Sequence, residues 1–338
     1  MNGAGEAAAG AVGLAPSRTD DRRTLRIALL AMIAFFAIAP VWIYPVFLMK
    51  VMCFALFACA FNLLIGYGGL LSFGHAMFLG GAGYVSAYLA KEGLAIPALG
   101  VALPPFTPEL AILCGMLAAG VLGFVVGLLA IRRQGIYFAM ITLALAQMVY
   151  FFCVQAPFTG GEDGIQAVPR GKLFGMIDLS TPATMYPTVF VIFVLGFLLI
   201  YRIVHSPFGQ VLKAIRENEP RAVSLGYDAD RYKLLAFVLS AALAGLAGAT
   251  NALVFQLAAL NAVHWTMSGE VVLMTLVGGL GTVFGPVVGA LAVLAMENYL
   301  AQLGQWVSIV QGLIFIVCVL AFRRGIVGEL ARWLNKPL

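Results

Sequence analysis

The chain has 338 residues, of which 62% are hydrophobic and only 10% are charged. Soluble domains have about 25% charged residues, so this composition excludes an ordinary soluble protein and predicts a chain that lies in lipid. The formal net charge of +5 is too small to indicate nucleic-acid binding. The five cysteines lie in apolar runs without metal or redox spacing, which predicts small core residues and no metal site.

The first 26 residues are rich in Gly and Ala and end in a basic group that contains Arg22, Arg23 and Arg26. An apolar run over residues 27–49 follows them. This run is longer than the core of a signal peptide, and no small-residue cleavage site closes it. We therefore expect residues 1–26 to form a tail and the apolar run to contain a retained first span.

Apolar segments of spanning length recur along the chain, since about 20 such residues cross the hydrocarbon layer as a helix. The segment at 269–281 is too short to span comfortably, so we expect it to be re-entrant or broken. The predicted fold class is an all-α polytopic membrane protein with about ten transmembrane or re-entrant helices. The candidate segments are residues 27–46, 47–66, 70–90, 110–131, 135–155, 186–203, 234–256, 269–281, 284–300 and 306–322.

Basic residues fall into four groups: before the first segment, after the fourth, between the sixth and seventh, and after the last. Ten segments place all four groups on one side, which the positive-inside rule assigns to the cytoplasm. Residues 27–325 are then the membrane domain, with a cytoplasmic loop at 204–233 and cytoplasmic tails at 1–26 and 326–338. Residues 269–300 can form two spans or one re-entrant pair, because either arrangement leaves all four basic groups on the same side.

Two similar glycine-rich breaks interrupt apolar segments, "GGLLSFGH" at 68–75 and "GGLGTVFGP" at 278–286. Paired interruptions of this kind can mark the binding region of a transporter. The alternative is that glycine is simply common in this chain, with 38 residues. The sequence has no Walker A pattern, so the chain does not bind ATP through a P-loop.

The charged stretch at 205–233 predicts two short helices between apolar segments. Ser206 can cap the first helix ahead of Pro207, Asn218 can end it and cap the second, and Gly226 can supply a left-handed stop. A modest apolar face with a mixed-charge rim suits a protein groove, so we expect a docking element for a cytoplasmic partner. The alternative is an amphipathic helix that rests on lipid.

Five collinear stretches of the chain carry a resemblance to one known family. They are "GYGGLLSFGHAMFLGGAGYVSAYLA" at 66–90, "RRQGIYFAMITLALAQMVYFF" at 132–152, "PFTGGEDGI" at 157–165, the charged stretch at 205–233, and "SGEVVLMTLVGGLGTVFGPVVGA" at 268–290. These stretches resemble the permease subunits of branched-chain amino acid ABC importers, the LivM type. The likeness runs from about residue 40 to residue 325, and it implies the ABC importer permease fold.

The resemblance implies three kinds of protein partner in a bacterial inner membrane, and no cofactor. A second homologous permease would complete the pathway, two cytoplasmic ATPase subunits would dock below, and a periplasmic amino-acid-binding protein would deliver substrate. ATP hydrolysis would reside on the partner subunits, so this chain is expected not to be an enzyme. The match to the family's ATPase-coupling loop covers Pro207, Gly209, Ala214, Arg216, Glu217, Asn218, Ala222 and Gly226.

Polar residues inside apolar segments are candidates for the substrate pathway, because such groups are costly in lipid and usually face a cavity or another helix. The alternatives are a capping or interfacial role for Glu270, and hydrogen bonding or packing between helices for the others. Glu297 is expected to be interfacial. The pathway candidates are Asn62, Ser72, His75, Thr142, Gln147, Glu270, Gly278 and Gly279.

The glycine-rich loop "TGGEDGI" at 159–165 lies on the outer side of the predicted topology. Its glycines permit turns with positive φ, and its two acids can pair with basic residues on a binding protein. A plain connecting loop is the alternative. The residues expected at this contact are Thr159, Gly160, Gly161, Glu162 and Asp163.

Three rival function classes fit the sequence less well. An ion-coupled secondary transporter keeps ionisable groups deep in the membrane, and few occur here. An intramembrane enzyme needs a nucleophile with a base, or clustered carboxylates or histidines, which the sequence lacks; nothing resembles a channel filter. We therefore predict a permease subunit of an ATP-driven importer for branched-chain amino acids. An ion-coupled amino-acid carrier, or an ABC permease for urea or short amides, is the alternative.

Overall fold

Helices account for most of the structure, which confirms the predicted all-α class. The computed structural model describes residues 18–96, 101–133, 135–321 and 325–333. The α-helices are α1 (Arg18–Ile38), α2 (Pro45–Asn62), α3 (His75–Lys91), α4 (Pro108–Ala130), α5 (Ile136–Gln155), α6 (Pro182–Val204), α7 (Pro207–Glu217), α8 (Glu219–Ser224), α9 (Ala229–Phe255), α10 (Trp265–Gly278), α11 (Gly285–Leu300), α12 (Val307–Ala321) and α13 (Gly325–Trp333).

Short turns and strands connect the helices. The described turns are η1 (Ala39–Val41), the π-helical η2 (Leu63–Tyr67), η4 (Pro157–Thr159), η5 (Gly161–Asp163), η6 (Leu260–Ala262) and η7 (Ala301–Trp306). The described strands form antiparallel pairs: β1 (Leu94–Ile96) with β2 (Val101–Leu103), β3 (Ile165–Gln166) with β6 (Leu257–Ala258), and β4 (Lys172–Leu173) with β5 (Ile177–Asp178).

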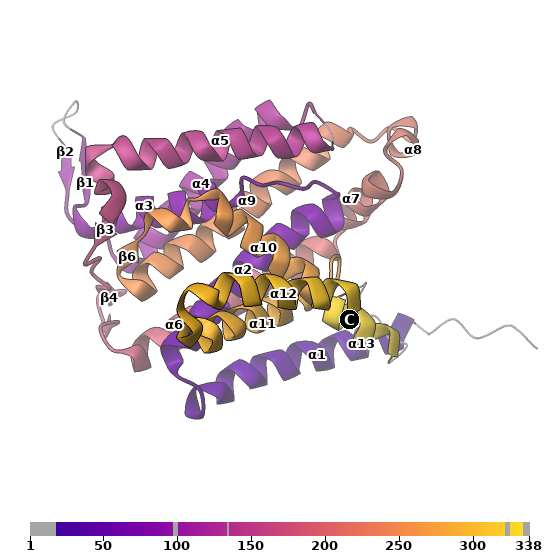
Figure 1. Cartoon of the computed structure of the whole chain (residues 1–338). Coiled ribbons are helices and arrows are strands. Elements are labelled where there is room, and N and C mark those ends of the chain that lie inside the picture. Colours follow the sequence, from indigo (N-terminus) through magenta and orange to yellow (C-terminus); the bar gives the residue numbers. More distant parts are fainter. Residues whose placement is uncertain (1–17, 97–100, 134, 322–324, 334–338) are drawn as a thin grey trace, which may run out of the picture.

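The two ends of the bundle differ in what they carry. Figure 1 shows the labelled strands at the left end, and α7, α8, α13 and the start of α1 at the right end. The first and last described helices therefore reach the same end, as an even number of crossings requires. Of the predicted tails, residues 18–26 belong to α1 and 326–333 to α13, whereas 1–17 and 334–338 lie outside the described residues.

Two prolines set the boundary between the first two apolar helices. α1 ends at Ile38, and a 3₁₀ turn and a bend separate it from α2, which begins at Pro45. Pro40 cannot continue α1, because it has no N–H to donate and its ring clashes with the preceding turn. Pro45 fits the first turn of α2, where no N–H bond is needed. The predicted boundary between 27–46 and 47–66 is therefore wrong.

Six helices within the described ranges are long and apolar enough to cross a membrane: α1, α2 with η2, α4, α5, α6 and α9. The other apolar helices, α3, α10, α11 and α12, have 17, 14, 16 and 15 residues. These lengths fall below the roughly 20 residues of an ordinary span. The predicted break is confirmed, because α10 ends at Gly278 and α11 begins at Gly285. α10 begins at Trp265, four residues before the predicted segment.

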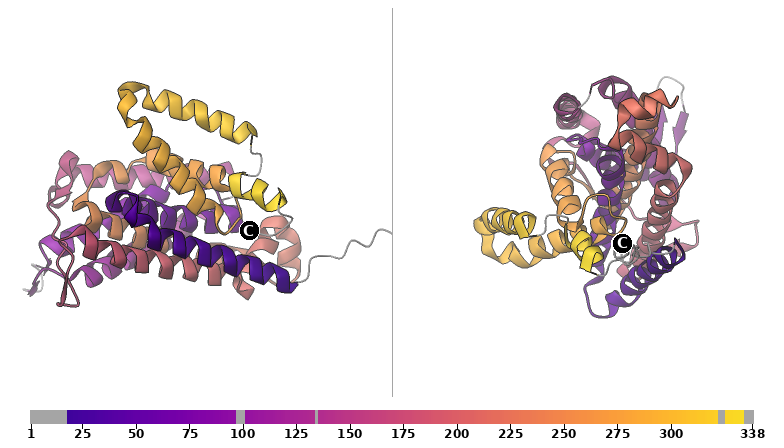
Figure 2. Two further views of the ribbon diagram at one scale, coloured as in Figure 1. Left: turned by 90° about the horizontal axis from the view of Figure 1, so that it is seen from below. Right: turned by 90° about the vertical axis from the view of Figure 1, so that its right-hand side faces the viewer.

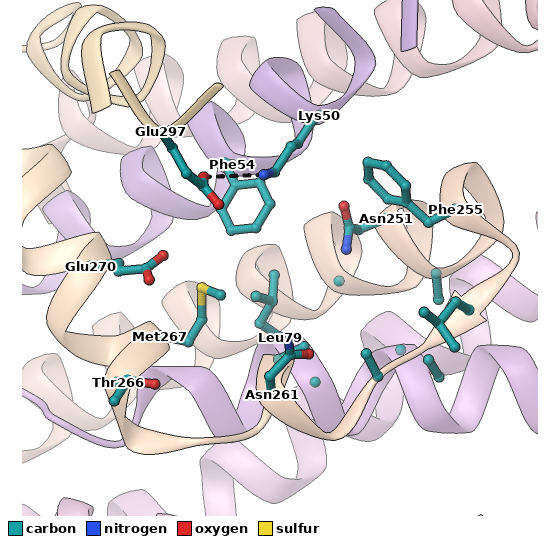
Figure 3. A pocket seen from close by; sticks show the side chains of 18 residues that line it. Lys50, Phe54, Leu79, Asn251, Phe255, Asn261, Thr266, Met267, Glu270 and Glu297 are labelled. Atoms are coloured by element: carbon teal, nitrogen blue, oxygen red, sulfur yellow. Dashed lines mark hydrogen bonds and ion pairs between the residues drawn. The ribbon is translucent and has the colours of Figure 1, made fainter. Parts of the chain in front are cut away.

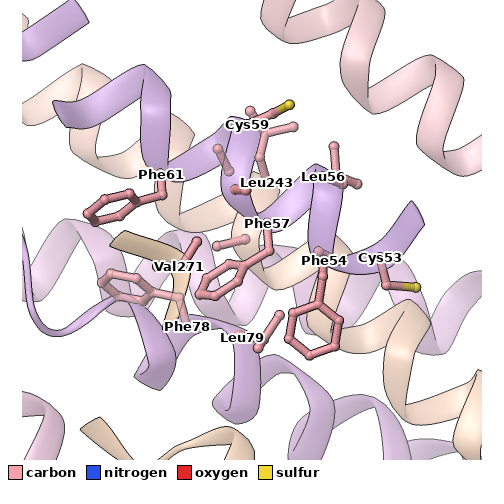
Figure 4. Close-up of a cluster of buried hydrophobic side chains, with 14 of the residues drawn as sticks. Cys53, Phe54, Leu56, Phe57, Cys59, Phe61, Phe78, Leu79, Leu243 and Val271 are labelled. Carbon is pink, nitrogen blue, oxygen red and sulfur yellow. The ribbon is translucent and has the colours of Figure 1, made fainter. Parts of the chain in front are cut away.

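α2 lies at the centre of the bundle. Its sequence is apolar on every side, which is typical of a helix enclosed by other helices, and most of its side chains are buried. Figure 4 shows Phe54 and Phe57 of α2 among side chains of three other helices, including Leu79, Leu243 and Val271. The long helix α9 also packs against α2, α3 and α4. The central position of α2 determines where its few polar residues can find partners.

The peripheral helices have the opposite character. α4, α6 and α12 expose large apolar side chains such as Leu117, Leu195 and Leu320. Figure 2 shows α12 set apart from the other helices at one side of the bundle. Exposed apolar surface on several helices suits lipid or another membrane protein.

A glycine permits the close approach of α3 and α9. A Cβ atom at Gly248 would overlap the carbonyl of Leu79, whereas a Cβ at Gly81 of α3 would have no neighbour within 4 Å. We therefore expect Gly248→Ala to destabilise the protein by about 1–3 kcal/mol through overpacking. Gly81→Ala is the matched control and should not. Thermal unfolding in detergent measures both, and equal melting temperatures would contradict this packing.

Candidate functional site

A polar cavity lies among α2, α3, α9, α10 and α11, near the end of the bundle that carries the strands. Its volume is about 400 Å³, and the segment at 257–262 forms part of its wall. Figure 3 shows the polar side chains around an otherwise apolar space. The polar lining residues are Lys50, Asn251, Asn261, Thr266, Glu270 and Glu297.

An ion pair crosses the cavity between α2 and α11. Lys50 Nζ lies 3.1 Å from Glu297 Oε2, and the two side chains are 31% and 47% exposed. Lys50 is the one charged residue in the sequence of α2. Figure 3 shows both side chains reaching into the space between their helices. Glu297 therefore contributes to a cavity, and its interfacial position stays a prediction.

Two further polar side chains face this cavity without a partner in the described part of the chain. The carboxylate of Glu270 in α10 makes no hydrogen bond or ion pair with a described residue. The Oδ1 atom of Asn251 in α9 is buried and has no donor. The Glu270 carboxylate and the Asn251 Oδ1 atom both accept hydrogen bonds, and acceptors that are shielded from water normally have a donor. The cavity therefore suits a ligand that donates hydrogen bonds.

The predicted outer loop is connected to the wall of the cavity. It contains η4 and η5, followed by β3, which pairs with β6 at the cavity's edge. Gly160 and Gly161 have φ values of 78° and 61°, which confirms the predicted positive φ. Thr159 is buried and donates to the carbonyl of Cys153. The acids that follow, Glu162 and Asp163, are exposed, so a contact with a binding protein stays a prediction.

A second polar contact joins α2 to the break between α10 and α11, and we call it the inner contact. Asn62 Nδ2 donates to the carbonyl of Thr282 over 2.9 Å, and Gly281 N donates to Asn62 Oδ1 over 3.0 Å. Arg216 of α7 donates through Nη1 to the carbonyl of Gly66 in η2. The inner contact is therefore connected to the charged stretch that was predicted to dock a partner.

The charged stretch folds into α7 and α8, and its predicted caps are confirmed. Ser206 Oγ accepts from Gly209 N over 3.4 Å. Asn218 Oδ1 accepts from Arg221 N over 3.1 Å. Gly226 has a φ of 91° and ends the second helix. These bonds join residues three apart, so local sequence determines them.

One face of α7 and α8 packs against the rest of the chain. Leu212 and Ile215 are buried, and Ala222 packs with Ile215 in a small cluster. Ala222 therefore faces inward. Lys233 Nζ of α9 lies 2.6 Å from Glu219 Oε1 of α8, and the Lys233 side chain is 5% exposed, so this ion pair fixes α8 to α9.

The opposite face of α7 and α8 is exposed, and we call Ala214, Glu217, Val223 and Leu225 the docking surface. All four residues are exposed, and the fractions for Val223 and Leu225 are 53% and 71%. Burial lowers the pKa of the neighbouring Lys213, and Glu217 partly offsets this effect. Exposed apolar side chains beside charged ones suit a protein partner.

Four of the predicted pathway residues lie outside both the cavity lining and the inner contact. His75 Nε2 is 2.8 Å from Ser240 Oγ, and its ring is enclosed by phenylalanines. Ser72 accepts from Gly74 N over 3.3 Å, and Thr142 donates to the carbonyl of Ala139 over 2.9 Å. Gln147 is half-buried on α5. Their role in a pathway stays a prediction.

The remaining candidates form two separate groups. Glu270 lines the cavity, whereas Asn62 belongs to the inner contact. Gly278 and Gly279 lie at the break, where an added Cβ on Gly325 of α13 would come within 2.5 Å of Gly279 N. The break is thus enclosed by α2 on one side and α13 on another.

Several polar residues of the cavity were not selected for the pathway by sequence reasoning, among them Lys50, Asn251 and Glu297. A lone lysine within an apolar segment is itself a signal, because a charge in lipid needs a partner. Its partner Glu297 is 247 positions away, so only the fold brings the two together. Asn251 stands near the end of a long apolar helix and has no local pattern around it.

Comparisons with known proteins give one consistent result. A family model described as "Branched-chain amino acid transport system / permease component" matches residues 44–319. The high-affinity branched-chain amino acid transport system permease protein LivM of Escherichia coli is 25% identical over 299 residues, which are 81% of this chain and 68% of that protein. A probable branched-chain amino acid transport permease protein LivM of Methanocaldococcus jannaschii is 25% identical over 68% of this chain and 73% of its own. No solved structure matches the chain.

The inner contact generates a prediction about Gly66. A Cβ at Gly66 would overlap Asn62 Oδ1 and lie 2.8 Å from Gly281 N, whereas a Cβ at Gly68 would have its nearest neighbour at 3.7 Å. We expect Gly66→Ala to release the Gly281 amide and to speed hydrogen exchange over residues 279–284 by about tenfold or more. Gly68→Ala is the control. Unchanged exchange in Gly66→Ala, measured by mass spectrometry, would show that the contact is not made.

Proposed function

Because the chain belongs to the branched-chain amino acid transport system permease family, we propose that it is a permease subunit of an ATP-driven importer of such amino acids. The observation that carries this proposal is the family match over residues 44–319. The polar cavity lies near one end of α2 and would hold the substrate. The inner contact lies near the other end and would block the substrate's exit.

The importer that we propose also contains other proteins besides this chain. Two ATPase subunits would hydrolyse ATP, since the sequence has no Walker A pattern. A second permease would complete the pathway, and a binding protein would deliver substrate to the end that carries the strands. The chain would lie in a bacterial inner membrane with the α7–α8 end in the cytoplasm, because the basic residues gather in the segments at that end.

Transport would proceed by alternating access around α2. With the inner contact formed, the cavity would accept substrate from the outer end. Closure of the ATPase subunits would move α7, and Arg216 would transmit that movement to η2 through the carbonyl of Gly66. Loss of the bonds between Asn62 and the 279–284 break would then open the cytoplasmic end.

An ion-coupled carrier is the second candidate, because Lys50, Glu270 and Glu297 place three ionisable groups in apolar helices. Such groups are the usual sites of proton coupling in membrane transporters. Uptake into vesicles separates the two functions. An importer needs internal ATP and the partner subunits, whereas an ion-coupled carrier works with a proton gradient and this chain alone.

The docking surface generates a prediction about assembly. We expect Glu217→Arg and Leu225→Glu each to weaken co-purification of the ATPase subunits at least tenfold, because each places charge or repulsion in the contact. Glu92→Arg, a charge reversal at an exposed residue between α3 and β1, is the control. Arg216→Glu is a poor substitute, since it also breaks the bond to Gly66. Full ATPase recovery and ATP-driven uptake in both variants would contradict docking at this surface.

A further inference from the structure

The cavity has one more negative charge than positive. It is lined by Lys50, Glu270 and Glu297, and Lys50 already pairs with Glu297 over 3.1 Å. Glu270 lines the same cavity as this pair, and the like charge of Glu297 makes its carboxylate harder to accommodate. An unpaired carboxylate among apolar helices is costly. A cationic hydrogen-bond donor would remove that cost.

From this arrangement we propose that the cavity binds an α-amino acid with an aliphatic side chain. Glu270 binds the ammonium group of the ligand, and Lys50 binds its carboxylate. The inference rests on the proposed function, which assigns amino acid transport but no residue to recognition. It places substrate recognition within the permease itself, in addition to any selection by a binding protein.

The two charged groups of such a ligand match the two ends of the polar lining. Figure 3 shows Glu270 on α10 across the cavity from Lys50 on α2. The Oδ1 atom of Asn251 is a further acceptor for the ammonium group, and it has no donor in the described structure. Hydrogen bonds between charged groups are about twice as strong as neutral ones, so a zwitterion is bound at both ends.

Apolar side chains supply the place for the aliphatic group. Phe54, Leu79 and Met267 line the cavity beside the charged residues. Methionine adapts its shape to different apolar ligands, which suits a site for several related side chains. The volume of about 400 Å³ lies within the range of about 300–1,000 Å³ that small-molecule sites have.

The same charges disfavour neutral ligands. Urea or a short amide would leave Glu270 without a counter-ion, and a site with unpaired polar groups rejects such analogues strongly. A carboxylate without an ammonium group would add a second uncompensated negative charge. The ion pair between Lys50 and Glu297 keeps the lysine neutralised until a carboxylate shares it, so the empty cavity has no unpaired cation.

Photo-crosslinking of the complete transporter tests this inference. Vesicles that contain the permeases and ATPase subunits, with binding protein outside, receive photo-leucine, a diazirine analogue of leucine, and are irradiated during ATP hydrolysis. Mass spectrometry then locates the adducts. We expect them on the peptides that contain Phe54 or Met267. Glu270→Gln and Lys50→Gln should each reduce this labelling about tenfold, because each replaces a charged partner of the ligand with a neutral one and so weakens the hydrogen bond to it. Glu92→Gln, at an exposed residue, should not.

Competition on the wild-type complex avoids variants that fail to fold. Without binding protein, excess leucine should abolish the labelling, whereas 4-methylpentanoate and isopentylamine, which each lack one charged group, should not. Adducts elsewhere, equal labelling in both variants, or full protection by either analogue would overturn the inference. Uptake of leucine by the same wild-type vesicles tests the proposed function separately. Absence of ATP-driven uptake overturns that function, whereas uptake without cavity labelling overturns only the inference.

Discussion

α2 is surrounded by apolar side chains, so each polar group on it must find its partner on a neighbouring helix. Two of these groups, Lys50 and Asn62, both bond to the pair formed by α10 and α11. They stand 12 positions apart, which is about 18 Å along a helix. The helix pair is therefore fixed to α2 near its N-terminus by an ion pair, which we call the outer tie, and near its C-terminus by hydrogen bonds to backbone, which we call the inner tie.

The two ties differ in a way that suits transport. The outer tie joins opposite charges beside a cavity, so a charged ligand can share or replace it. The inner tie binds the amide side chain of Asn62 to a glycine-rich break, and no ligand is needed to complete it. Because Arg216 of α7 bonds to η2 one turn beyond Asn62, movement of α7 acts on the inner tie first. One helix thus connects the polar cavity to the α7–α8 end of the bundle, where we propose that the ATPase subunits dock.

Local features of the fold were predictable from the sequence. The caps at Ser206 and Asn218 depend on residues three positions away. The break between α10 and α11 lies in the glycine-rich stretch that predicted it. The cavity was not predictable in the same way, since Lys50 and Glu297 meet only after the chain has folded. His75, Thr142 and Glu270 were all predicted to line the substrate pathway because they are polar residues in apolar segments. Burial separates them, because His75 and Thr142 bond within the packed helices and Glu270 faces open space.

The tie between α2 and α11 is tested most directly by a double-mutant cycle on thermal stability. The purified wild type, Lys50→Met, Glu297→Gln and the double variant are unfolded in detergent under one set of conditions. The account predicts that the double variant loses less stability than the sum of the two single losses, because each single change leaves an unpaired charge among apolar helices. Single losses that add within about 0.5 kcal/mol would contradict a direct tie between the two helices.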